Sequence, residues 1–445
     1  MNILIIIINI FLSISVFSFS NDDLLDNQYL FFLIQAVTMM PYLLVKIKFI
    51  YQFFTPSFFI LTYYTFSFSL GSYFAPKGFG FITKDFYISD LLKVQNFQVI
   101  IFYLLLVNII LFALTIRALN INPLTPKKNN LPEVDIEHSN INIFSVFVIF
   151  IIVSLIPFFG SFGLQFGTVI IFCIAIKSKS FLKRILLYLP LLIMFVIFNH
   201  DNKREVILMT FAILALDSLF SKEKFKIDIK NSSLYIVAIS LLVTLVTTSS
   251  ILRGYGGYGD VNFFKALSLV PKYIGSDNFI DSIIDNFEVS SVYPSVVLSI
   301  EYIETGRLSL IYGESLIKPL FLPIPRDFFP SKPESIITIF TREQSPHFLL
   351  RGGSLPVAFP GELFINFHFF SLFILLGIVS FFNYIFSSLK NLPSHGLLFK
   401  ISSAASLLIF IFIRGGGLDL YTISLLSSFI IIVLSSLKSG FKIRI

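Results

Sequence analysis

The stretch FQVIIFYLLLVNIILFALTI, Phe97 to Ile116, holds twenty residues and no charged side chain. A helix rises about 1.5 Å per residue, so a stretch of this length crosses the roughly 30 Å of hydrocarbon in a bilayer. This stretch therefore predicts a transmembrane helix.

Apolar runs of similar character recur along the whole chain and predict about twelve transmembrane helices. The first run has no basic residues before it and no small-residue cleavage site, so we expect a membrane span there and not a signal peptide. The expected spans are Ile3–Phe17, Tyr29–Val45, Phe53–Tyr73, Phe97–Ile116, Ile143–Phe159, Leu164–Ile176, Phe181–Phe198, Val206–Phe220, Leu234–Ser250, Leu363–Ile385, Leu397–Ile413 and Leu418–Leu437.

The composition of the chain agrees with an all-α membrane bundle. Of its 445 residues, 56% are hydrophobic and 13% charged, and the mean hydropathy is +0.86. Soluble domains carry about a quarter charged residues. The chain has too little polar surface to solvate a globule, so its solvent is expected to be lipid.

Several functional classes are excluded by what the sequence lacks. The net charge of +7 comes from Lys and Arg in short gaps between apolar runs, which favours topology signals and lipid contacts over nucleic-acid binding. The single cysteine, Cys173, allows no disulfide framework. The five histidines form no zinc-ligand spacing, and no phosphate-binding GxxxxGK[ST] loop indicates an ATPase.

The distribution of basic residues predicts the orientation of the bundle. One set of alternate loops holds eighteen Lys and Arg, and the short loops of the other set hold six. Basic residues are retained on the cytoplasmic side, so both termini are expected in the cytoplasm. We expect spans one to nine in residues 1–250, a large outward loop in 251–361, and spans ten to twelve in 362–445.

Apolar residues recur at three- and four-residue steps within the large outward loop, from Val289 to Ile303. This spacing predicts a helix. Two environments fit it equally: the membrane interface, or the inside of a small subdomain.

Basic residues gather on the predicted outward face, and three of them are arginines beside glycines. Arginine supplies a fork of donors that binds phosphate, and adjacent glycines let a backbone approach an anion closely. The pattern predicts an anionic ligand, for which the diphosphate of a polyprenyl-linked sugar is the obvious candidate. The residues concerned are Lys203 and Arg204, Arg253, Arg351 and Arg414.

Aromatic and titratable residues lie near these basic residues in the sequence. Tyr255 and Tyr258, in GYGGYG, suit stacking on sugar rings or a flexible tether. Glu362 opens the tenth predicted span, where the helix dipole favours a carboxylate. His368 follows inside that span, where a histidine is expected to face protein or water. Either residue is a candidate general base. Each also has an ordinary structural interpretation, Glu362 as a helix cap and His368 as a packed residue within the membrane.

Two segments resemble a known family. YGESLIKPLFLPIPRDFFPSKP, Tyr312–Pro333, and RGGSLPVAFPGELFINF, Arg351–Phe367, are similar to the long periplasmic loop and following span of Wzy-type oligosaccharide repeat-unit polymerases. A Gly-rich approach, a Pro-Arg pair, a Lys-Pro pair and a Gly-Glu pair occur in that order. NHDNKREVILMTFAIL, Asn199–Leu214, resembles their basic loop before a span.

The resemblance implies a GT-C-like glycosyltransferase of the bacterial inner membrane. Such an enzyme joins undecaprenyl-diphosphate-linked oligosaccharides into O antigen or capsule on the periplasmic side. No cofactor, metal or nucleotide sugar is expected, because lipid diphosphate is the leaving group. The resemblance also implies a chain-length regulator as a further partner. The family's basic residues map onto Arg204, Arg253, Arg326 and Arg351.

Two other functions stay open. An O-antigen ligase shares the architecture and depends on a loop histidine, for which His347 is the candidate. A flippase or exporter is expected to show two-fold internal similarity and charged residues within several spans. The sequence shows neither the two-fold similarity nor the buried charges that a flippase or exporter would have.

Overall fold

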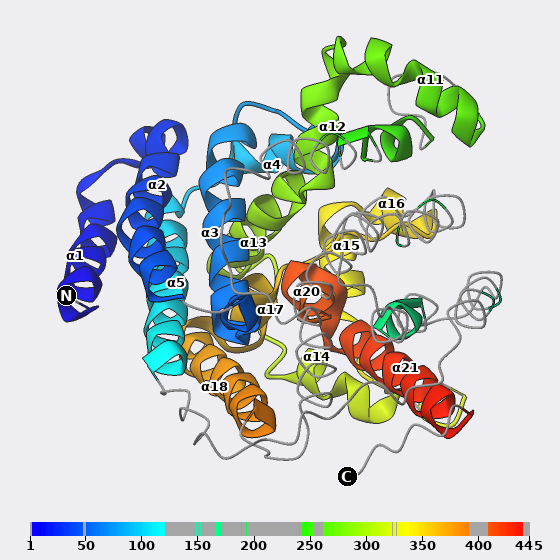
Figure 1. The fold of residues 1–445 in the computed structure, drawn as a ribbon. Coiled ribbons are helices and arrows are strands. Elements are labelled where there is room, and N and C mark those ends of the chain that lie inside the picture. Colours follow the sequence, from blue (N-terminus) through cyan, green and yellow to red (C-terminus); the bar gives the residue numbers. More distant parts are fainter. Residues whose placement is uncertain are drawn as a thin grey trace.

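The structure is a computed structural model that describes most of the two ends of the chain and the large loop. The described residues are 2–47, 50–120, 261–322, 324–325, 327–390 and 408–438, with short pieces at 148, 152, 165–170, 188, 193, 240, 243–244 and 246–252. Every regular element in these parts of the chain is a helix, as predicted (Figure 1).

The N-terminal third forms a layer of long helices, α1 (Asn2–Ser15), α2 (Asn21–Lys46), α3 (Pro56–Phe74) and α5 (Phe97–Asn120). They pack against one another at the blue and cyan side of Figure 1. These helices coincide with the first four predicted spans. The sequence marks where two of them begin: a Ser20–Asp23 capping box precedes α2, and Pro56 occupies the first turn of α3.

Four helical segments of the described residues are long and apolar enough to cross a membrane. They are Asn21–Lys46, Phe97–Leu119, Phe359–Ser387 and Ile409–Ile430. The chain is therefore a multi-pass membrane protein by this measure. The total of twelve spans stays a prediction, because several of the expected spans lie outside the described residues.

The tenth predicted span is not one continuous helix. It consists of α17 (Phe359–Phe367), a 3-10 turn (His368–Phe370) and α18 (Ser371–Lys390). His368, at the break, has φ 50° and ψ −140°, a backbone conformation that costs energy in a residue other than glycine. The prediction of an unbroken helix from Leu363 to Ile385 was wrong at this point.

The helix predicted inside the large loop is present as α13 (Val289–Glu304) and lies in the middle of the bundle. Nearly all of its residues are buried, and it packs against α3 and α17. Gly71 of α3 lets the two helices approach closely, because a side chain there would meet the Tyr293 side chain and the Val289 carbonyl. A helix along the membrane interface would expose one face, so that reading was wrong.

Hydrogen bonds fix the large loop to the segment that precedes α5. Asp281 accepts a hydrogen bond from the Gly80 amide at 2.7 Å and pairs with Lys84. Glu301 accepts from the Gln95 and Asn96 amides at 3.0 and 3.2 Å, at the N-terminus of α5. These predicted outward segments therefore meet at one end of the bundle.

The remaining helices of the described residues are mostly short. They are α4 (Ile88–Leu91), α11 (Phe263–Ile274), α12 (Asn278–Asn286), α14 (Glu314–Ile317), α15 (Ile336–Gln344), α16 (Pro346–Leu350) and α20 (Ile409–Ile411), together with the longer α21 (Gly417–Lys438). Of these, α4, α12 and α14 pack against α13 or α17.

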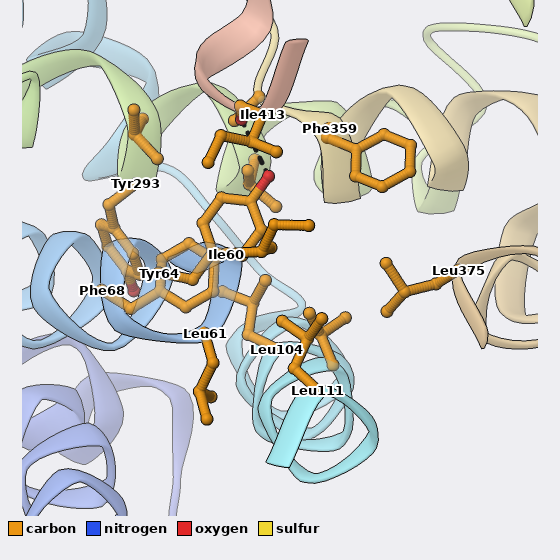
Figure 2. Close-up of a cluster of buried hydrophobic side chains, with 14 of the residues drawn as sticks. Ile60, Leu61, Tyr64, Phe68, Leu104, Leu111, Tyr293, Phe359, Leu375 and Ile413 are labelled. Atoms are coloured by element: carbon orange, nitrogen blue, oxygen red, sulfur yellow. Dashed lines mark hydrogen bonds between the residues drawn. The ribbon is translucent and has the colours of Figure 1, made fainter. Parts of the chain in front are cut away.

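An apolar core joins the N-terminal layer to the C-terminal helices. Tyr64 of α3 stacks on Phe68 and donates a hydrogen bond to the Ile413 carbonyl at 2.8 Å (Figure 2). That carbonyl is free to accept because the helix is irregular at residues 412–416, between α20 and α21. The core thereby holds the C-terminal break next to the start of α17.

Candidate functional site

The centre of the candidate site is Glu362, in the first turn of α17. Its side chain is completely buried, with 0% exposure. Oε1 accepts a hydrogen bond from the Ser315 hydroxyl at 2.7 Å, and Oε2 has no partner among the described residues. The predicted placement at a helix start is confirmed. A buried carboxyl oxygen without a hydrogen-bond donor is unusual in a folded protein.

Asn366 locks the segment around Ser315 onto α17. Its Nδ2 donates to the Ser315 hydroxyl at 2.8 Å and to the Glu362 carbonyl at 2.7 Å. Its Oδ1 accepts from the Gly313 amide, also at 2.8 Å. Gly313 has φ 91° and faces the Phe367 ring, so both conformation and space favour glycine there. Glu362, Ser315 and Asn366 thus form one buried polar network.

A charged pair lies beside this network. Lys318, just after α14, forms an ion pair with Asp419 in the first turn of α21. Both side chains are largely buried, with 14% and 10% exposure. The helix dipole favours Asp419 at this position. The pair thus couples the large loop to the last described helix.

Arg414 lies in the irregular turn before α21 and is held by Glu288. Its Nη1 donates to Glu288 Oε1 at 2.8 Å. Glu288 is 2% exposed, directly precedes α13, and accepts a second hydrogen bond from the Ser291 hydroxyl at 3.0 Å. Arg414 therefore uses at least one donor within the protein.

Arg351 lies in the turn that ends α16 and has a different environment. Its side chain is exposed, and its guanidinium has no hydrogen bond or ion pair with the residues that the structure describes. Gly352, at φ 79°, closes the turn. All donors of this arginine are available to an anion.

His368 faces Glu304 at the C-terminal end of α13. Its Nε2 lies 2.9 Å from Glu304 Oε1, and its ring packs against Phe364. The histidine was expected to face protein or water. One side contacts protein, and 39% of the side chain is exposed. His368 and Glu362 have separate partners, so the structure does not join the two candidate bases.

The other predicted site residues lie outside the described residues. They are Lys203, Arg204, Arg253, Tyr255, Tyr258 and Arg326.

Sequence reasoning missed Ser315, Lys318, Asn366 and Asp419. One signal was present: Glu362 and Asn366 are four residues apart, which places two polar side chains on one face of an apolar helix. Asp419, two residues after the glycine run 415–417, is similarly a polar residue within a predicted span. Nothing in the sequence pairs either residue with Ser315 or Lys318.

Comparison with known proteins found no matching family model, no matching curated protein and no matching solved structure.

Proposed function

We propose that this protein is a membrane glycosyltransferase that joins lipid-diphosphate-linked oligosaccharide units into a surface polysaccharide. The observation that carries the proposal is the Ser315–Glu362 hydrogen bond. It joins the two segments in which the sequence resembles repeat-unit polymerases, and it does so at a buried carboxyl. The segments Tyr312–Pro333 and Arg351–Phe367, which the sequence connected only through their resemblance to that family, thus share one buried polar network.

In the proposed reaction, the growing glycan is cut from its carrier and moved to the incoming unit. A hydroxyl of the incoming unit attacks the first carbon of the glycan, and the bond from that carbon to the phosphate oxygen breaks. The proton of the hydroxyl passes to Glu362 Oε2, which has no partner among the described residues. The lipid diphosphate leaves with the bonding electrons.

Arginine is proposed to stabilise the charge that develops on the leaving diphosphate. Arg351 suits this role because its guanidinium is exposed and unpaired within the described part of the chain. Arg326 is proposed as its companion from the sequence alone. Donors that meet a developing oxyanion account for a large share of catalysis in acyl and phosphoryl transfer.

The proposal includes the location and orientation of the enzyme in the cell. The enzyme lies in the bacterial inner membrane with both termini in the cytoplasm, and its site opens to the periplasm. The contacts of the large loop with residues 80–96 support a single outward end of the bundle. The substrates are undecaprenyl-diphosphate-linked oligosaccharides, and a chain-length regulator is an expected partner.

Deletion of the gene tests the function. We expect surface lipid with at most one repeat unit, seen as a single band in a gel of extracted polysaccharide. Full-length polymer that accumulates without attachment to the surface lipid would indicate a ligase. Loss of even the single-unit band would indicate a flippase or a ligase. Either outcome would contradict the polymerase proposal.

A further inference from the structure

Helix α11 has an apolar stripe that the rest of the described chain leaves uncovered. Phe264, Leu267 and Ile274 are exposed, Phe264 by 79%. At about 100° per residue these positions fall on one side of the helix. A stripe of this kind on a helix indicates a contact with lipid or with another protein.

The other two faces of α11 are distinct from this stripe. Val270 and Tyr273 are buried in a small cluster around Ile251, which forms the inward face. Lys265, Ser268 and Lys272 are exposed and form a polar face. The helix is therefore apolar on two adjacent sides and basic on the third, which is the pattern of a helix that lies in a membrane surface.

The depth of α11 follows from what its inward face contacts. Ile251 comes directly after the ninth predicted span, Leu234–Ser250, and it is completely buried against α11. The Ser250 hydroxyl accepts hydrogen bonds from Ser282 at 2.6 Å and from Asn286 at 2.9 Å, both in α12. Both helices thus sit at the level where that span is expected to leave the hydrocarbon.

We infer that α11 lies in the headgroup layer of the bilayer. Its apolar stripe faces the acyl chains, and Lys265 on the polar face meets the phosphates of anionic lipids, which complement its charge. Exposed Ile280, in α12, extends the apolar surface beyond α11. The interfacial position, one of the two environments considered for Val289–Ile303, is thereby assigned to residues 263–274.

Fluorescent labels at neighbouring positions test this placement. In a Cys173→Ser background, Leu267→Cys and Ser268→Cys each carry one environment-sensitive label, about 100° apart on the helix. The full chain is reconstituted into vesicles of phosphatidylcholine and phosphatidylglycerol. We expect nitroxide-labelled acyl chains to quench the label at 267 and aqueous iodide to quench the label at 268.

Three results would overturn the inference. Iodide quenching at both positions would place α11 in water, and protection of position 267 from both quenchers would indicate a protein cover. Quenching at 267 that is unchanged without phosphatidylglycerol would refute the role of anionic lipid. Ile274→Cys, on the same stripe, must behave like Leu267→Cys, so a local misfold at one position cannot produce the expected pattern.

Discussion

Ser315 and Glu362 are 47 residues apart in the sequence, and the serine hydroxyl lies 2.7 Å from the Glu362 carboxyl. The hydrogen bond connects α14, in the large loop, to the first turn of α17. Glu362 is completely buried, so its Oε1 would lose the hydroxyl that donates to it if Ser315 were removed. The position of the carboxyl therefore depends on this loop.

Ser315→Ala is expected to loosen the loop and reduce polymer length. An unpaired buried acceptor costs about 1–3 kcal/mol. We expect a lower melting temperature in detergent and a shorter polysaccharide ladder on a gel. Ser331→Ala, at an exposed serine, is the matched control. The account of this bond fails if the two variants melt at the same temperature.

Arg351→Lys is expected to impair polymerisation without affecting folding. The exposed side chain has no partner among the described residues, so the change removes no internal contact. Lysine keeps the charge and loses the fork of donors. Loss of one donor to a transition-state oxyanion lowers the rate by about a hundred- to a thousandfold. A polysaccharide gel from cells with equal protein levels measures the effect.

Arg342→Lys is the control for that experiment. Arg342 lies nearby on α15 and binds both oxygens of Glu334 at 2.9 and 2.8 Å, so it is occupied within the protein. We expect wild-type chain lengths from this variant. Wild-type ladders from both Arg351→Lys and Arg326→Lys would refute diphosphate binding by this loop.

Arg414→Gln is expected to lower the amount of folded protein, because it removes a cation that pairs with the buried Glu288 carboxylate. Breaking a buried pair costs about 3–5 kcal/mol. The double variant Arg414→Gln/Glu288→Gln is expected to recover both protein level and polymer. If the double variant accumulates normally but makes no polymer, Arg414 binds substrate as the sequence predicted.

Gly415→Ala is expected to destabilise the break before α21. A Cβ there would lie 2.6 Å from the Val357 backbone, and Gly415 has φ 109°. Strain of this kind costs roughly 1–3 kcal/mol. Gly377→Ala, where a Cβ meets nothing within 4 Å, should be neutral or stabilising. Equal melting temperatures of the two variants would contradict the close packing at Val357.

Much of the helical architecture could be predicted from the sequence, because long apolar runs leave few alternatives in lipid. The helices α2, α3 and α5 occur where the runs predicted them. Glu362 also lies at its helix start, since proline and glycine next to it mark the first turn.

The burial of α13 could not be predicted from its residue pattern. Ser295 and Ser299 place two hydroxyl groups on one side of this helix. Their hydroxyls donate to the Val292 and Ser295 carbonyls, at 3.0 and 2.6 Å, so these serines need no water. Small side chains that satisfy themselves on their own backbone can be buried at little cost.

The break at His368 and the partners of Glu362 were missed for different reasons. No glycine or proline occurs at residues 368–370 to signal the break. The strained residue, His368, instead lies beside Glu304, which is distant in the sequence. Ser315 and Asp419 reach the site through long-range packing, which local patterns do not contain.

Glu362→Gln tests the central claim most directly. Glutamine has nearly the same shape, and its carbonyl can accept the Ser315 hydrogen bond, but it cannot take a proton. A positioned general base contributes about a hundred- to ten-thousandfold in rate. The measurement is the chain-length ladder of a deletion strain that carries the variant at wild-type protein level and melting temperature. The account predicts only the single-repeat band, and a ladder of wild-type length would contradict it.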